Sequence, residues 1–436
     1  MKKRLNSFHI IILSFAGVIL LGALLLMLPF ASTGAPAPFS DALFTATSAV
    51  CVTGLVVRDT GSAWAPFGQA VILLLIQIGG LGVVTVAASF AMAAGRKISL
   101  RQRSTMLEAM SAPTLGGILK LAGFIVRGTL LVEGIGAALL LPSMLKTHGL
   151  RGIWLAVFHA ISAFCNAGFD LLGTADAPFV SLTGFSGDWA VNLVVMALII
   201  VGGLGFLTWD DIRAHGVHLK RYRLQSKIIL ATSALLIVIP AAVLYGSDFA
   251  GQKDGIWLAL FQSVTTRTAG FNTADLAAMS GAGRMIMIGL MLIGGSPGST
   301  AGGLKTTTFA VLLLSAVSSL HRRKEVHAFG RRIETDIVRS AAALLMLYLG
   351  IACGGAIAIS LIEGLPIGTC LFETASAIGT VGLTLGITPA LGTVSRVILM
   401  AMMFFGRIGG LTLFYAASSA ADARIARFPQ EKITVG

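Results

Sequence analysis

The chain has 436 residues, of which 56% are hydrophobic and only 12% are charged, and its mean hydropathy is +0.88. A soluble domain carries roughly 25% charged residues, so this composition excludes an ordinary water-soluble protein. A net charge of +13 would suit a nucleic-acid-binding protein. The basic residues lie in short segments between apolar stretches, however, which indicates membrane topology instead.

The first apolar stretch, residues 9–30, follows Lys2, Lys3 and Arg4. It is longer than the ~7–15 apolar residues of a signal peptide, and the Ala-Ser-Thr-Gly that follows is a poor cleavage site. We therefore expect a first transmembrane helix here rather than a signal peptide.

Most of the 32 Lys and Arg residues fall in the N-terminus, 95–105, 213–227, 321–332 and the C-terminal tail. The segments between them carry few, so the positive-inside rule predicts a multi-pass protein with both termini in the cytoplasm. The expected location is the plasma membrane of a bacterium.

Two motifs each occur four times in the same order. The first runs from a Phe to a Gly, ten residues apart in three copies and nine in the third: Phe44 to Gly54, Phe158 to Gly168, Phe261 to Gly270 and Phe372 to Gly382. The second follows inside the next apolar stretch: Gly79-Gly80-Leu81-Gly82, Gly202-Gly203-Leu204-Gly205, Gly294-Gly295-Ser296-Pro297-Gly298 and Gly409-Gly410-Leu411. A fixed period of this length is the signature of a repeated structural unit.

Each unit reads as a membrane span, a short half-helix and a returning span. The predicted first spans are about 9–30, 117–142, 227–246 and 335–361. The half-helices are about 40–50, 152–164, 255–266 and 367–378, and the second spans about 64–93, 188–210, 284–318 and 393–418. The predicted fold is all-α and membrane-integral, with eight transmembrane helices and four re-entrant half-helices around one pore. The repeats are 1–94, 95–212, 213–320 and 321–436, the last including the cytoplasmic tail.

The first motif is read as an ion-selective loop. Non-helical backbone at membrane depth is tolerated only where protein covers it or where it lines water. Carbonyl oxygens can replace the hydration shell of a cation, and helix C-termini favour cations. Close helix packing would explain one such glycine, but four in register favour a filter. For the second motif, close packing around the pore is the favoured interpretation. The candidate filter residues are Val52, Thr53, Gly54, Asn166, Ala167, Gly168, Thr268, Ala269, Gly270, Thr380, Val381 and Gly382.

Residues 294–308 interrupt an otherwise apolar span with a Gly- and Pro-rich run that should not remain helical. The sequence predicts a mobile intramembrane gate here, with a static kink as the alternative. The candidate gate residues are Gly294, Gly295, Ser296, Pro297, Gly298, Ser299, Thr300, Ala301, Gly302, Gly303, Lys305 and Arg407.

Arg407 lies in the middle of a predicted span, where an arginine costs roughly 2.5–3.5 kcal/mol and normally faces the bundle interior. A positive charge there suits a barrier to cations, although a structural pair with a carboxylate or carbonyl is an alternative. Arg267 lies at the end of the third half-helix, and we expect it to support the filter from behind, with Glu373 as its candidate partner.

Enzyme signatures are missing from the sequence. It contains no Walker loop and no Cys-x-x-Cys, so neither an enzyme nor an organic cofactor is predicted. Cys51, Cys165, Cys353 and Cys370 read as small packing residues.

Three segments carry a family resemblance: residues 163–169, residues 265–272 and residues 295–306. They resemble the Trk/Ktr/HKT superfamily of K⁺ transporters, and the KtrB branch most, over nearly the whole chain. The resemblance implies that one glycine per repeat lines the K⁺ site, here Gly54, Gly168, Gly270 and Gly382. It also implies an intramembrane gate and a homodimer in which each subunit has its own pore. The partner it implies is a cytosolic ring of nucleotide-binding regulatory (KtrA-type) subunits. Na⁺-stimulated K⁺ uptake, a symport, is implied for many members, and the sequence itself leaves the sodium effect open.

The leading interpretation is a K⁺-translocating subunit of a regulated uptake system. An autonomous cation channel is one alternative, disfavoured because no voltage-sensor helix or cytosolic domain is evident. A secondary transporter of another solute is the second, although that class usually has two inverted halves. We further expect the basic segments 96–103, 213–227 and 321–332, together with the tail, to dock the regulatory subunits.

Overall fold

The computed structural model describes residues 7–410 and 412, apart from 97, 111–115 and 324. The described chain is mostly helical, with one small antiparallel hairpin of β1 (Val326–Ala328) and β2 (Arg331–Ile333). Several predicted features lie outside the described residues: the N-terminal basic run, Lys97, Lys324, Leu411 and the tail 413–436.

Four helices are each long and apolar enough to cross a membrane. All four start within three residues of the predicted first spans: α1 (Ser7–Leu26), α7 (Ile118–His148), α11 (Leu224–Leu244) and α15 (Thr335–Glu363). A five-residue π turn, Tyr245–Phe249, extends α11. Glycines with positive φ end α7 at Gly149 and α15 at Gly364, and Gly364 has the left-handed conformation typical of helix C-caps.

Four shorter helices each fold back on the long helix before them. Their bounds agree within one residue with the predicted half-helices: α2 (Phe39–Val50), α8 (Arg151–Phe164), α12 (Gly255–Thr265) and α16 (Ile367–Gly379). Glycines permit the close approach at two of the starts. A Cβ on Gly152 would collide with the Met144 carbonyl, and one on Gly255 with the Phe249 carbonyl.

In the first two units, the second helix differs from the prediction because it is interrupted. Helices α4 (Pro66–Leu81) and α5 (Val83–Ala93) meet at a 94° bend, and α9 (Trp189–Gly203) and α10 (Phe206–His215) at a 96° bend. Continuous spans at 64–93 and 188–210 are therefore wrong. The other second helices are α13 (Gly281–Leu292), α14 (Thr306–Leu320) and α17 (Thr393–Ile408). Counting each bent pair as one span, length and composition give up to six crossings in the described part of the chain.

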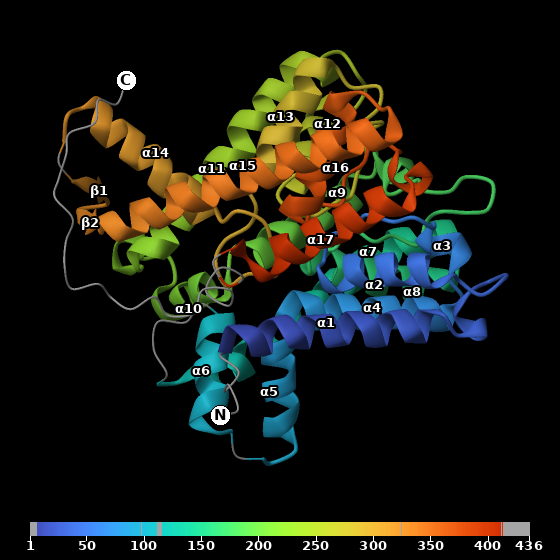
Figure 1. Ribbon diagram of the computed structural model, residues 1–436, viewed down its shortest axis with the longest axis horizontal. Coiled ribbons are helices and arrows are strands. Elements are labelled where there is room, and N and C mark those ends of the chain that lie inside the picture. Colours follow the sequence, from blue (N-terminus) through green and yellow to red (C-terminus); the bar gives the residue numbers. More distant parts are fainter. Residues whose placement is uncertain (1–6, 97, 111–115, 324, 411, 413–436) are drawn as a thin grey trace.

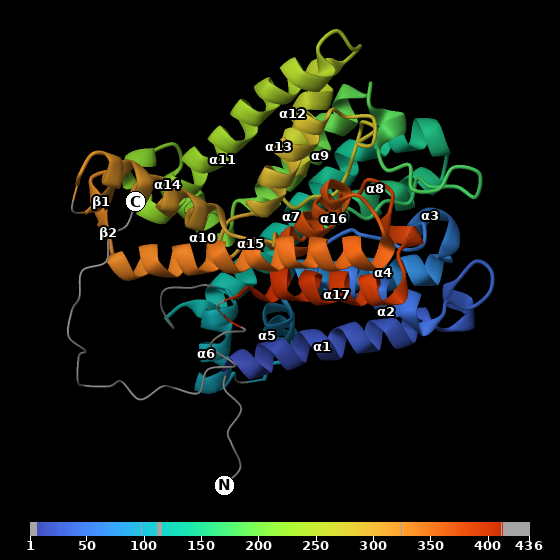
Figure 2. The ribbon, with the colours of Figure 1, turned by 45° about the horizontal axis from the view of Figure 1, so that its top comes forward.

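The basic segments lie together at one end of the molecule. Helices α5, α6 (Leu100–Ala109), α10 and the β-hairpin gather there, whereas α3 (Thr60–Ala63) and the loops after the half-helices lie at the opposite end (Figures 1 and 2). Short 3₁₀ turns complete the connections: Pro29–Ala31, Thr183–Phe185, Leu219–Arg221 and Thr388–Ala390.

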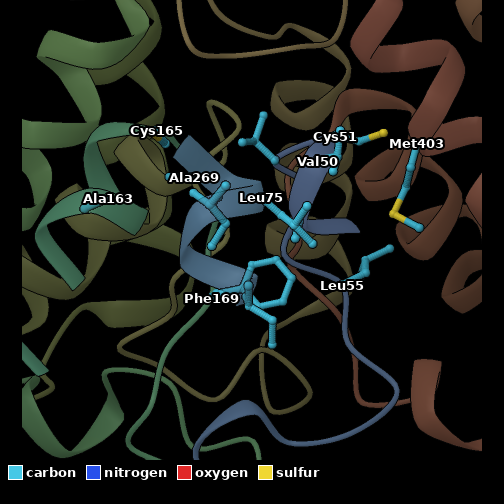
Figure 3. Packing of buried hydrophobic residues seen from close by; sticks show 14 of the residues in the cluster. Val50, Cys51, Leu55, Leu75, Ala163, Cys165, Phe169, Ala269 and Met403 are labelled. Carbon is cyan, nitrogen blue, oxygen red and sulfur yellow. The ribbon is translucent and has the colours of Figure 1, made fainter. Parts of the chain in front are cut away.

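The core lies where the half-helices end. Figure 3 shows side chains from separate quarters of the chain packed at this centre, among them Val50, Phe169, Ala269 and Met403. Three of the four cysteines are buried, and all four are free thiols, with Cys353 exposed on α15.

Candidate ion pathway

The four loops after the half-helices share one backbone shape. The residue two before each motif glycine has positive φ in every copy: Val52 49°, Asn166 57°, Thr268 71° and Thr380 52°. The glycines follow at Gly54 90°, Gly168 69°, Gly270 84° and Gly382 93°. Positive φ is uncommon for residues other than glycine, so its recurrence shows that the same turn is built four times.

The four glycines lie next to one another in a closed ring. A Cβ built on Gly54 would lie 3.1 Å from the Gly168 Cα, and one on Gly168 would lie 2.9 Å from the Gly270 Cα. A Cβ on Gly270 would lie 3.3 Å from the Gly382 Cα, and one on Gly382 would lie 2.9 Å from the Gly54 Cα. Contacts this short leave no room for a side chain, so both crowding and positive φ require glycine at these positions.

The carbonyl just before each glycine faces the preceding member of the ring. The Ala167 oxygen would lie 2.5 Å from a Cβ on Gly54, and the Ala269 oxygen 2.7 Å from one on Gly168. The Val381 and Thr53 oxygens meet Gly270 and Gly382 in the same way. Because each half-helix ends within a few residues of its glycine, four helix C-termini with partial negative charge converge on this ring.

Four buried hydroxyls support the loops, and sequence reasoning missed them. Ser48 and Ser376 each accept a hydrogen bond of 3.0 Å from the glycine N–H of their own repeat. Ser162 donates to the Phe169 carbonyl (2.7 Å), and Thr265 donates to the Phe271 carbonyl (2.6 Å). A signal was present, because a Ser stands six residues before the glycine in three motifs and a Thr five before it in the shorter third.

A cavity of about 100 Å³ opens above the ring, lined by all four glycines together with Asp59 and Asp170. Asp59 is committed to backbone groups, since it accepts hydrogen bonds from the Ser62 and Phe179 N–H groups at 2.8 Å. Asp170 is partly buried. Burial, offset by backbone hydrogen bonds and reinforced by the Asp59 charge, raises the pKa of Asp170 to about 6. This mouth is therefore acidic, and its charge depends on pH near neutrality.

The second helices of three repeats each break at a glycine, and these three glycines have the same conformation. The φ and ψ angles are 84° and 129° at Gly82, 89° and 139° at Gly205, and 90° and 134° at Gly409. Conformations like these are accessible to glycine alone. Aligned on these breaks, the fourth motif is Gly406-Arg407-Ile408-Gly409. The predicted register, Gly409-Gly410-Leu411, is three residues too late.

This alignment also explains the first glycine of the motif. A Cβ on Gly79, Gly202 or Gly406 would collide with the carbonyl of Val50, Phe164 or Ile378, respectively. Each of these carbonyls lies four residues before its repeat's ring glycine. The first motif glycine thus lets the second helix pack against the end of its own half-helix, and Arg407 occupies the place of Gly80 and Gly203.

The third repeat has a longer interruption, from Ile293 to Lys305. The expected loop 294–308 is too long at its end, because α14 already begins at Thr306. The loop's N–H groups bind carbonyls at the ends of other helices: Ser296 to Gly203 (3.0 Å), Thr300 to Gly202 (3.3 Å) and Gly303 to Gly406 (3.1 Å).

Side chains add further ties within and beyond the loop. The Thr300 hydroxyl donates to the Phe164 carbonyl at the end of α8 (3.0 Å), and Ser296 and Thr306 share a hydrogen bond of 3.1 Å. Lys305 folds back onto its own loop, donating to the Ala301 carbonyl at 2.8 Å. The loop is therefore ordered by hydrogen bonds rather than by apolar packing alone.

Arg407 links this loop to the first repeat. Its guanidinium donates to the Thr300 carbonyl in the loop and to the carbonyls of Gly79 and Gly80 at the end of α4. Together with Gly80, Gly298, Ser299 and Lys305, it borders a cavity of about 160 Å³ on the side of the loop facing α6. The loop and two cations thus lie between this cavity and the ring.

The expected pairing of Arg267 with Glu373 is wrong. Arg267 donates to the Ser233 hydroxyl on α11 at 3.0 Å. Glu373 instead accepts hydrogen bonds from Thr384, the Leu385 N–H (3.1 Å) and Thr388 (2.8 Å) in the loop beyond its own ring glycine. Both side chains make their hydrogen bonds within their own repeat, although the Arg267 Nε is buried without a partner among the described residues.

Comparison with known proteins identifies the family of this chain. Residues 3–425 match the family described as TrkH, cation transport protein. The chain belongs to the Trk/Ktr family of cation transport proteins. The predicted family resemblance is confirmed.

The relatives match over nearly their full length. The potassium/sodium uptake protein NtpJ of Enterococcus hirae is 38% identical, over 100% of this chain and 98% of that protein. The Ktr system potassium uptake protein B of Bacillus subtilis is 38% identical, over 98% of this chain and 96% of that protein. The crystal structure of TrkH from Vibrio parahaemolyticus is similar in fold, with a TM-score of 0.75 at 19% identity, covering 96% of this chain and 86% of that one.

Proposed function

We propose that this chain is the K⁺-translocating pore subunit of a regulated potassium uptake system. The closed ring of Gly54, Gly168, Gly270 and Gly382, with four helix C-termini converging on it, carries the proposal. Full-length relatives named as potassium and potassium/sodium uptake proteins support the choice of ion. In this proposal four repeats surround one pore, and the second motif turns each returning helix beneath it.

The chemistry of the proposed filter is dehydration. A K⁺ ion entering from the acidic cavity exchanges its water for backbone carbonyls of the four filter loops. Each loop contributes the ring glycine and the two residues before it. The carbonyls immediately before the glycines belong to Thr53, Ala167, Ala269 and Val381. The hydroxyls of Ser48, Ser162, Thr265 and Ser376 hold the loops, so the carbonyls do not have to reorganise around the ion. With one glycine per repeat, selectivity should be less strict than in a filter of several consecutive carbonyl rings.

We also propose that residues 293–305 form the gate. The loop lies across the path below the ring, and the Arg407 charge beside it repels a cation that has already lost water. Opening would require the loop to exchange its hydrogen bonds to the α9 and α17 carbonyls for water. A partner that binds the open arrangement more tightly would supply that bias.

The partners we propose are a second copy of this chain and a cytosolic nucleotide-binding ring. The basic segments at one end of the molecule, which include Arg322 and Arg323, would face the cytoplasm with the termini and dock that ring. Neutralising Arg322, Arg323 and Lys324 should reduce co-purification with the regulator. Full retention at moderate salt would exclude this loop from the docking surface.

The deciding experiment is uptake of K⁺, Rb⁺ and Na⁺ in a host lacking its own K⁺ uptake systems, and in liposomes holding the purified chain. We expect growth at low K⁺ in the host, and slow K⁺ flux in liposomes that rises when the regulator is added. Fast flux from the chain alone would favour an autonomous channel. Absence of K⁺ and Rb⁺ flux, with transport of an organic solute, would favour a secondary transporter.

A further inference from the structure

A large groove lies away from the ring, on the end of the molecule that carries the basic segments. Its volume is about 850 Å³, and its walls come from α5, α7 and α10. Most of the lining is apolar, including Met92, Leu119 and Leu131. Helices α5 and α10 are the second members of the two bent pairs, and they turn away from the direction of α4 and α9 by 94° and 96°.

Three cations line this groove, and no carboxylate does: Lys120 and Arg127 from α7, and Arg213 from α10. In the described part of the chain, Lys120 and Arg127 make neither an ion pair nor a hydrogen bond. The Arg213 guanidinium lies 5.1 Å from the centre of the Phe124 ring, a cation–π contact that leaves its charge unneutralised. Lys120 and Arg213 also line an adjoining cavity that contains Asp210, but that carboxylate is already paired with Arg223 at 3.0 Å.

Arg127 is exposed on α7 and has no partner within the described residues, so an anion at this position would stabilise its charge. It lies nine residues into α7, roughly 13 Å along the axis from Ile118. Its neighbours Leu130 and Leu131 are 61% and 65% exposed, as expected on a face that meets lipid tails. An unpaired guanidinium at that depth is costly to a membrane protein. The cost disappears if a phosphate reaches down to it while acyl chains cover the leucines.

We propose that this groove is a binding site for an anionic phospholipid of the leaflet on the basic side. Lys120, Arg127 and Arg213 bind the head-group phosphate, and the acyl chains lie along Phe124 and Leu131. Basic pockets between transmembrane helices on the cytoplasmic side are the usual form of such sites. The lipid would join α5 of the first repeat to α7 and α10 of the second. The proposal does not depend on which ion the chain carries.

The test is native mass spectrometry of the purified full chain with phosphatidylglycerol or phosphatidylcholine added at equal concentration. We expect the wild type to retain phosphatidylglycerol in preference to phosphatidylcholine. The variant K120Q/R127Q/R213Q should bind phosphatidylglycerol at least about tenfold more weakly. The variant R221Q/R322Q/R331Q, which removes the same charge from exposed positions in the other basic segments, should bind it like the wild type.

Two further variants protect the test against misfolding. The charge-preserving variant K120R/R127K/R213K should keep the preference, and R213Q alone, at an exposed position, should reduce it. Equal binding of both lipids by the wild type, or unchanged binding by the triple Gln variant, would overturn the proposal. So would full displacement of the lipid by millimolar inorganic phosphate, which would indicate a free-anion site. A change in oligomeric state in the triple Gln variant with lipid binding unaltered would identify a contact between copies instead.

Discussion

The four loops that form the glycine ring are nearly alike, whereas the breaks in the four second helices are not. In the ring, every repeat has the same pair of positive-φ residues and a supporting hydroxyl, even where the third motif is one residue shorter. In the second helices, Gly82, Gly205 and Gly409 share one conformation, but the third repeat has a loop from Ile293 to Lys305 instead.

If the ring is the proposed filter and the third-repeat loop the proposed gate, the difference follows from these two roles. The members of a ring that meets one ion must all be equivalent, because each is built against the next and a distorted one displaces its neighbours. A barrier across a single path needs only one moving part. Placing that part in one repeat leaves the other three breaks free to hold the helices around it.

The largest expected effect comes from breaking the ring. Gly270→Ser should reduce the preference for K⁺ over Na⁺ at least about tenfold, because a Cβ there lies 3.1 Å from the Gly168 Cα and φ is 84°. Uptake of both ions in a K⁺-uptake-deficient host measures it. Gly289→Ser, at a glycine of α13 with open space around it, is the matched control. Unchanged discrimination in all four ring Gly→Ser variants would remove the filter assignment.

Removing the centre of the loop 293–305 tests whether it acts as the gate. Deleting residues 298–302 takes away the Thr300 ties to α8 and α9, and should raise K⁺ flux without a regulator by about tenfold. Flux into liposomes holding the purified variant is the measurement. If the variant folds, fills no faster than the wild type and still responds to the regulator, the interruption is a static kink.

Arg407→Ala should act in the same direction with a smaller effect, about threefold, since it removes only one tie between the loop and its surroundings. Hydrogen bonds to charged groups contribute about 1.5–3 kcal/mol each. In the Ala variant the bonds to Gly79 and Gly80 would be lost whether the gate is open or closed, so only the bond to the Thr300 carbonyl affects the balance between the two states. Arg407→Lys keeps the charge and loses the forked geometry. Equal flux in the Ala and Lys variants would show that the charge plays no part.

The hydroxyl supports predict a selectivity change of a few-fold. Ser376→Ala deprives the Gly382 N–H of its partner, which costs about 1 kcal/mol and loosens one of the four loops. Ser14→Ala, which removes a hydroxyl bonded to a carbonyl in α1, is the control. Relative permeation of K⁺, Rb⁺ and Na⁺ should change in Ser376→Ala only. A change of the same size in both variants would show that the ring hydroxyls stabilise the protein in general and do not act on selectivity.

The smallest effect is a pH dependence at the mouth. Because its pKa is raised to about 6, Asp170 is charged above that pH and becomes neutral as the pH falls through it. K⁺ uptake at sub-saturating K⁺ should therefore fall about twofold between pH 7 and pH 5. Asp170→Asn should abolish that step, whereas Asp176→Asn, at an exposed position of the same loop, should retain it. Identical pH profiles for the wild type and Asp170→Asn would contradict this assignment.

The long helices and the half-helices could be predicted because hydropathy and the repeated motif determine them independently. The bends at Gly82 and Gly205 could not be predicted, since these glycines stand inside continuous apolar stretches. Hydropathy gives the length of an apolar stretch but does not show whether its helix bends. The sequence alone puts the fourth motif in the wrong register, because Arg407 stands where the first two repeats have a glycine. The partner of Glu373 was missed because Thr384 and Thr388 lie outside the repeated motif.

The order in which the ring closes has a consequence for biosynthesis. Gly54 is synthesised long before Gly382, the neighbour that completes its surroundings and follows α16. During synthesis the first three loops must therefore wait beside an open gap, with their carbonyls unmatched on one side. A chain truncated before α16 lacks Gly382 and cannot close the ring, so the proposed ion site would form only after α16 has been inserted.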